Sequence, residues 1–121
     1  MTKQHFGTSK VPLSPAVRAG DFVYASGQVP TGPDGKVVPG GVEEQTRQVL
    51  ENLKAALALA GCGMSDVVKC LVILTDASEF AAFNSVYATY FPQNPPARTT
   101  MQAGLMIDIK VEIEAIAYKP L

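Results

Sequence analysis

Apolar residues recur at three- and four-residue spacing between residues 42 and 60, which is the period of a helix with one buried face. Glu43 and Glu44 lie at the start of this stretch, where the positive end of a helix favours carboxylates. Gly61 follows the last apolar residue, as a glycine that ends a helix does. We therefore predict a helix over residues 42–60, with an apolar side formed by Val42, Thr46, Val49, Leu50, Leu53, Ala56, Leu57 and Ala60.

Two stretches have the patterns of strands. Residues 67–74 are almost continuously β-branched or aliphatic, which is typical of a strand covered on both faces. Residues 110–118 alternate instead, as a strand with one buried face does. One face of this second strand carries Val111, Ile113, Ala115 and Ala117, and the other carries Lys110, Glu112, Glu114 and Ile116.

Turn and capping signals divide the rest of the chain. Gly20-Asp21 predicts a two-residue hairpin turn between strands at 16–19 and 22–26. Residues 36–38 are expected to form a short returning strand. The stretch from Asp76 to Glu79 resembles a capping box and predicts a second helix to about residue 90. We expect a strand at residues 99–104 and an irregular or edge segment at residues 1–13.

The predicted order is β-β-α-β-α-β-β, which defines an α+β fold with a mixed sheet. The right-handed crossover rule places both helices on one face of that sheet. The other face is then uncovered, although it is partly apolar. We predict that copies of the chain cover it, giving a homo-oligomer.

Length and charge narrow the possible functions. A chain of 121 residues is expected to form a single domain, here residues 1–121. Its formal net charge is −1 and its charges form no blocks, so the sequence does not indicate a basic surface that would bind nucleic acid or an anionic membrane. No stretch approaches the apolar length of a spanning helix, and the first residues lack a signal-peptide pattern. We expect a soluble, cytoplasmic protein.

Few residues are available for nucleophile or metal chemistry. His5 is the only histidine, so a serine triad and a structural zinc site are not expected. Cys62 and Cys70 are expected to remain unpaired, with Cys70 in the core. The glycine spacings match no phosphate-binding loop, so no nucleotide or redox cofactor is expected. The strand carboxylates of Glu112 and Glu114 leave only a carboxylate-based metal site open, and we assign no metal.

Arg98 follows two prolines in a segment with few charges, and a guanidinium there is suited to bind a carboxylate with two parallel hydrogen bonds. The alternative is a surface salt bridge with Asp108 or Glu79. Glu112 is a candidate for handling a water molecule, whereas two solvated carboxylates on an open sheet are the alternative. Asn84, beside the apolar stripe of the second helix, is either a substrate contact or an ordinary polar helix residue.

The chain resembles the RidA (YjgF-type) family of reactive imine and enamine deaminases over nearly its whole length, from about residue 12 to residue 118. The resemblance implies a chorismate-mutase-like fold, a homotrimer with sites at subunit interfaces, and no cofactor. The stretches that carry it are Ser26-Gly27-Gln28-Val29-Pro30, Gly40-Gly41-Val42-Glu43-Glu44-Gln45-Thr46, Asn52-Leu53-Lys54, Asp66-Val67-Val68-Lys69, Asn84-Ser85-Val86-Tyr87, Pro96-Ala97-Arg98 and Val111-Glu112-Ile113-Glu114-Ala115.

By this resemblance the protein hydrolyses 2-imino acids to 2-keto acids and ammonia. Arg98 matches the arginine that binds the substrate carboxylate, and Glu112 matches the glutamate that handles the attacking water. The resemblance also assigns pocket-lining positions to Ser26, Gly27, Asn84, Thr100 and Leu13.

Two of these positions differ from the family pattern. Leu13 replaces a tyrosine that helps to close the pocket, and Thr100 stands where cysteine or serine is common. The alternatives are therefore a Rid-type trimer with another, pathway-specific substrate, or a non-catalytic protein that binds small carboxylates. Endoribonuclease activity, reported for some relatives, gains little support from the net charge.

Overall fold

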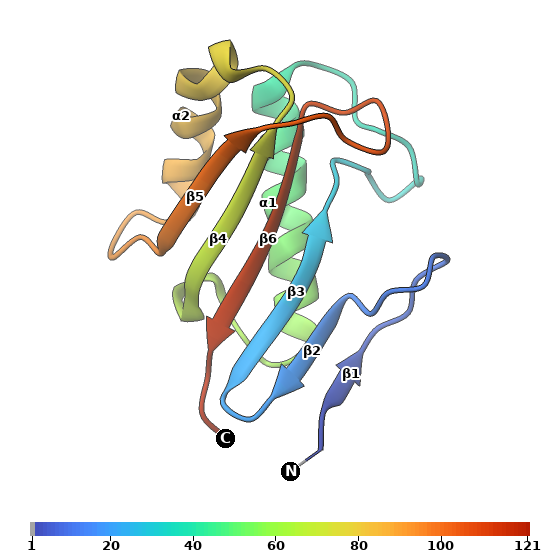
Figure 1. The fold of residues 1–121 in the computed structure, drawn as a ribbon, viewed down its shortest axis with the longest axis vertical. Helices are drawn as coiled ribbons and strands as arrows, with labels where there is room; N and C mark the ends of the chain where they lie inside the picture. The colour runs from blue at the N-terminus through green and yellow to red at the C-terminus, as the bar shows by residue number, and fades with distance from the viewer. Residues whose placement is uncertain (1) are drawn as a thin grey trace.

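The computed structural model describes residues 2–121 and contains one six-stranded mixed sheet with two helices behind it (Figure 1). The strand order is β1-β2-β3-β6-β4-β5; β4 and β5 run parallel, and all other neighbours are antiparallel. The predicted α+β class and the placement of both helices on one face are confirmed. The elements are β1 (Gln4–Phe6), β2 (Ala16–Ala19), β3 (Phe22–Gln28), α1 (Val42–Leu59), β4 (Val67–Leu74), α2 (Phe80–Tyr90), β5 (Ala97–Gln102) and β6 (Val111–Tyr118).

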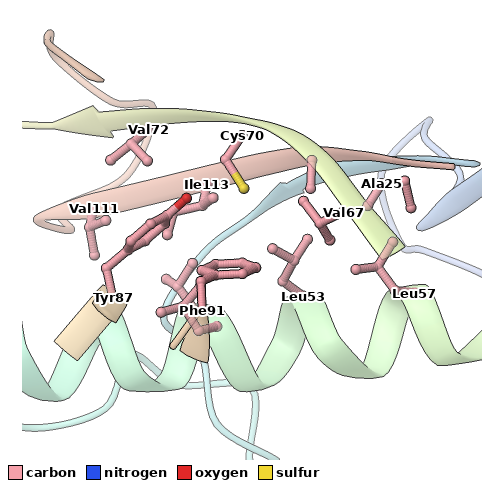
Figure 2. Packing of buried hydrophobic residues seen from close by; sticks show 14 of the residues in the cluster. Ala25, Leu53, Leu57, Val67, Cys70, Val72, Tyr87, Phe91, Val111 and Ile113 are labelled. Atoms are coloured by element: carbon pink, nitrogen blue, oxygen red, sulfur yellow. The ribbon is translucent and has the colours of Figure 1, made fainter. Parts of the chain in front are cut away.

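Helix α1 covers the centre of the sheet. It starts with a carboxylate contact, in which the Gly41 amide donates to Glu44 Oε1 at 2.7 Å. Leu50, Leu53 and Leu57 on its inner side are fully buried in the core. Figure 2 shows Leu53 and Leu57 pointing from α1 toward the sheet. Burying a leucine side chain contributes roughly 1.5–3 kcal/mol, so this face anchors α1 to the sheet.

Helix α2 begins later than the sequence indicates. Asp76 does accept a hydrogen bond from the Ser78 amide, but it caps a short 3-10 turn, Ala77–Glu79, that precedes the helix. The proposed capping box is wrong, because the Glu79 carboxylate lies 3.7 Å from Lys110 Nζ instead of returning to the helix start. The buried side of α2 includes Phe83 and Tyr87, and the ring of Phe91, directly after the helix, packs against that of Tyr87.

Two predicted strands differ from the structure, whereas β1 agrees with the irregular or edge segment expected near the N-terminus. Strand β5 begins directly after Pro96 and ends at Gln102, because it pairs with β4 from Lys69 onward. Within the region first expected to be irregular or at an edge, β1 forms an edge strand against β2. The expected strand at residues 36–38 is reduced to an isolated bridge between Thr31 and Val37.

The sheet face away from the helices is open within residues 2–121 (Figure 1). It carries the exposed side chains of Tyr24 and Met101 and, between them, the carboxylates of Glu112 and Glu114. A partly apolar face of this kind is what a second chain covers in an oligomer.

Other sequence predictions concern chemistry and membranes. Cys62 and Cys70 are both free, and Cys70 is buried in the core, as expected; Cys62 is buried as well. Within the described part of the chain, neither helix is long and apolar enough to cross a membrane.

Candidate functional site

The candidate residues form two clusters on opposite faces of the sheet. Residues that pair across neighbouring strands point to the same face. Arg98 pairs with Cys70, which is buried beneath the helices, so the Arg98 side chain leaves β5 on the helix side. Glu112 pairs with Ile73 on the open face. Within one chain, the arginine and the glutamate therefore do not share a site.

The Arg98 guanidinium is held by helix α2. Its Nη1 donates to Oδ1 of Asn84 at 3.0 Å. The guanidinium carbon lies 4.8 Å from the ring centroid of Tyr87, 5.5 Å from that of Phe80 and 5.6 Å from that of Phe83. Cation–π contacts with three rings, together with one hydrogen bond to the side-chain amide of Asn84, fix the orientation of the half-buried guanidinium.

Arg98 has no carboxylate partner at ion-pair distance among residues 2–121. The Glu79 carboxylate is paired with Lys110 instead, and no ion pair joins Asp108 to Arg98. The surface salt bridge considered for Arg98 is therefore wrong for this chain. A half-buried guanidinium that lacks an anion is suited to bind one from a ligand.

A hollow of about 250 Å³ lies beside this arginine. Phe80 forms one wall and also contacts the guanidinium, so the hollow and the cation are adjacent. Thr100 contributes to the lining of the hollow, and its Oγ1 is buried without a hydrogen-bond partner within residues 2–121. The lining is mostly apolar and consists of Leu74, Ala77, Phe80, Thr100, Met101 and Gln102.

Neutral groups lie beneath the guanidinium. Tyr87 points its hydroxyl toward the sulfur of Cys70 (Figure 2). Burial raises the pKa of the Tyr87 hydroxyl and that of the Cys70 thiol, so both remain protonated at neutral pH. Neither group therefore neutralises the positive charge of Arg98, which remains available to an anionic ligand.

The second cluster surrounds Glu112. A Cβ atom added to Gly27 would collide with the Glu112 carboxylate, so the absence of a side chain at residue 27 makes room for that group. Ser26, the preceding residue, donates its hydroxyl to the Ser14 carbonyl oxygen at 2.6 Å. Leu13, next to Ser14, is about half exposed at 47%. Ser26, Gly27 and Glu112 thus lie together, with Leu13 one residue beyond their hydrogen-bonded neighbour.

Burial raises the pKa of the Glu112 carboxyl, and the nearby charge of Glu114 adds to the rise. A carboxylate with a raised pKa is a better proton acceptor at neutral pH than an ordinary surface glutamate. Glu114 itself is exposed. Its effect on the site is therefore electrostatic.

Comparison with known proteins identifies the family. A family model described as Endoribonuclease L-PSP matches residues 4–119. A RutC family protein of Pyrococcus horikoshii is 48% identical over 110 residues, covering 89% of this chain and 87% of that protein. The 2-iminobutanoate/2-iminopropanoate deaminase of Mus musculus is 46% identical over 110 residues, covering 89% of this chain and 82% of that protein. The crystal structure of RidA from the Antarctic bacterium Psychrobacter sp. has a TM-score of 0.89 and 38% identity, covering 95% and 98% of the two chains.

The chain belongs to the RidA family. The resemblance noted in the sequence is thereby confirmed, and the observed sheet with two helices is consistent with the chorismate-mutase-like fold of the RidA family.

Two residues near Arg98 were not expected at the site. Phe80 begins α2 and forms both a wall of the hollow and a contact to the guanidinium. Tyr87 lies one helical turn beyond Asn84 and makes the shortest ring contact to Arg98. Phe80 is four residues before Asn84 and Tyr87 three residues after it, a spacing that indicates one side of a helix but is equally typical of a purely structural apolar stripe.

The described residues offer no cluster of three or more histidine, cysteine or acidic side chains that would bind a metal. Glu112 and Glu114 lie on the same face of β6, but no third such side chain of the described residues joins them. The site is accordingly best described as a guanidinium cluster and a carboxylate cluster.

Proposed function

We propose that this RidA family member hydrolyses 2-imino acids, and the enamines that tautomerise to them, to 2-keto acids and ammonia. The observation that carries the proposal is the oriented, half-buried guanidinium of Arg98, which lacks a carboxylate partner in residues 2–121. A substrate carboxylate would satisfy it with two parallel hydrogen bonds. The mouse relative is named for two 2-imino acids, 2-iminobutanoate and 2-iminopropanoate, which supports the same substrate class.

In this mechanism Arg98 binds the substrate carboxylate, and Glu112 accepts a proton from the attacking water. The water oxygen bonds to the imine carbon while the C=N π electrons move to nitrogen, which takes the proton from Glu112. The hydroxyl proton of the carbinolamine then passes by the same carboxylate to nitrogen, the C–N bond breaks, and ammonia leaves the new C=O group. Orientation and one proton acceptor suffice because the imine carbon is already electrophilic.

We further propose that the complete site forms between chains of a homotrimer. The guanidinium and carboxylate clusters point to opposite faces of one sheet, so one chain would supply Arg98, Asn84 and Thr100. Its neighbour would supply Glu112 with Ser26, Gly27 and Leu13. The open, partly apolar face of the sheet supports such an assembly. The two buried free cysteines agree with a reducing compartment, and we place the protein in the cytoplasm.

The family description names an endoribonuclease, but the net charge of −1 gives RNA no electrostatic footprint. Leu13 and Thr100 allow another possibility, a RidA family trimer with a different, pathway-specific substrate. A protein that binds small carboxylates without turnover is a further alternative.

The test generates 2-iminopropanoate and 2-iminobutanoate in situ with an amino acid oxidase and follows their loss against uncatalysed decay. The wild-type protein should accelerate this loss, and Arg98→Ala should lower kcat/KM by about 100-fold, as expected for two charge-assisted hydrogen bonds. Arg47→Ala, which removes an exposed arginine from α1, is the matched control and should keep full activity.

Absence of acceleration by the wild-type protein would reject these substrates. Calorimetric binding of 2-oxobutanoate that depends on Arg98, without imine turnover, would instead favour the carboxylate-binding alternative.

A further inference from the structure

The loop of residues 7–15, between β1 and β2, is held at its C-terminal end. The Ser26 amide donates to the Pro15 carbonyl oxygen at 3.0 Å, and the Ser26 hydroxyl donates to the Ser14 carbonyl oxygen at 2.6 Å. These bonds join the loop to the strand that carries Gly27. The loop between its two ends is exposed.

His5 supplies a third contact to the same end of the loop. Its Nδ1 lies 2.9 Å from Ser14 Oγ, across nine residues of sequence. His5 is the middle residue of β1, where it pairs with Val17 in β2. A continuous hydrogen-bonded path therefore runs from His5 through Ser14 to Ser26, and from there along the chain to Gly27 beside the Glu112 carboxylate.

We propose that His5 is a positioning residue that fixes Ser14, and through it the exposed Leu13 side chain and Ser26, at the carboxylate half of the site. The catalytic consequence rests on the proposed function, because it requires Leu13 to contact a substrate. The placement of the loop itself does not depend on that function. Without β1, the Ser14 hydroxyl would lose its side-chain partner and the loop would be held by Ser26 alone.

The kinetic test compares His5→Ala, Ser14→Ala and the double variant. Loss of one hydrogen bond of ordinary strength should raise KM for the imine about five-fold and leave kcat close to wild type. The double variant should show no more than the larger single effect, because both changes remove the same contact. His5→Asn should restore KM to within about two-fold of wild type, since an asparagine side-chain group can occupy the position of Nδ1.

Gln4→Ala is the matched control, because it alters the adjacent exposed residue of β1 without touching Ser14. Additive effects of the His5 and Ser14 changes, or an unchanged KM in His5→Ala, would overturn the proposal.

A second measurement needs no activity. Lys10 is an exposed trypsin site within the loop. His5→Ala should accelerate cleavage after Lys10 about five-fold, whereas His5→Asn and Gln4→Ala should be cleaved at the wild-type rate. Equal cleavage rates in all four proteins would contradict the positioning role, even if the protein had no deaminase activity. If the expected differences in cleavage rate were seen but the protein did not hydrolyse imines, the proposed function would be rejected. The role of His5 in holding the loop would then still stand.

Discussion

The Glu112 carboxylate lies so close to Gly27 that a side chain at residue 27 would collide with it. Adding a single methyl group there therefore tests whether the position of the carboxylate matters. Gly27→Ala should displace the carboxylate end of Glu112, which is the flexible part of that side chain. We expect kcat for imine hydrolysis to fall about ten-fold or more, because a misplaced proton acceptor is a poor one. Thermal unfolding should change little.

Gly104→Ala is the control for Gly27→Ala, because a Cβ atom at residue 104 meets no atom within 4 Å. It should keep wild-type activity. If Gly27→Ala retained full kcat with a stable fold, the position of the Glu112 carboxylate would not matter for the reaction.

Glu112 also predicts the pH dependence of the reaction. Burial and the charge of Glu114 raise its carboxyl pKa, so the acidic limb of the kcat/KM profile should lie above the usual range for glutamate. Glu114→Gln should move this limb to lower pH, but only in part, because the burial remains. Glu112→Gln should remove the limb together with most of the activity. A limb that stays unmoved in Glu114→Gln would contradict this assignment.

The raised pKa of Glu112 also makes the stability of the fold depend on pH. The folded chain binds the Glu112 proton more tightly than the unfolded chain does, so this group stabilises the fold at low pH. That contribution is lost as the pH rises through the raised pKa. Glu112→Gln should therefore resist denaturant better than wild type at neutral pH, and the two proteins should converge in acid.

At the residue scale, sequence alone named Arg98 and Asn84, and the structure joins them by a hydrogen bond. The sequence did not indicate that the side chains of Arg98 and Glu112 leave the sheet on opposite faces. That fact depends on the pairing of β5 with β4 and of β4 with β6, which no local pattern specifies.

At the element scale, α1 depends on the leucines of its inner side. Leu53→Ala, at a fully buried position, should lower the free energy of unfolding by about 2–5 kcal/mol, since it removes buried methyl groups and leaves a cavity. Leu59→Ala makes the same change at the end of α1, where the side chain is 53% exposed, and should have a much smaller effect. Denaturant titration measures both. Equal losses would contradict the assignment of the buried face.

The elements with strong periodicity were predictable, namely α1, β4 and β6. The sequence also predicts α2, but residues 77–79 form a 3-10 turn before it, and the Glu79 carboxylate pairs with Lys110 across the fold. The predicted bounds of β5 lie two residues too late, since its pairing with β4 determines where it begins. Tertiary contacts, which no local window contains, set these boundaries.

At the scale of the whole molecule, the open sheet face and the two separate clusters lead to the same prediction. A single chain should be inactive, and a trimer should contain sites built from two chains each. The measurement of mass in solution by light scattering tests the assembly. It does not test whether chains share a site.

Mixing two inactive variants tests that sharing directly. Arg98→Ala and Glu112→Gln chains, unfolded together in equal amounts and refolded, should combine at random. A site needs Arg98 from one chain and Glu112 from its neighbour, so about a quarter of the sites should contain both, and imine hydrolysis should recover to about a quarter of the wild-type rate. Each variant refolded alone should stay inactive. If the mixture stayed as inactive as the separate variants while forming trimers, a site shared between chains would be contradicted.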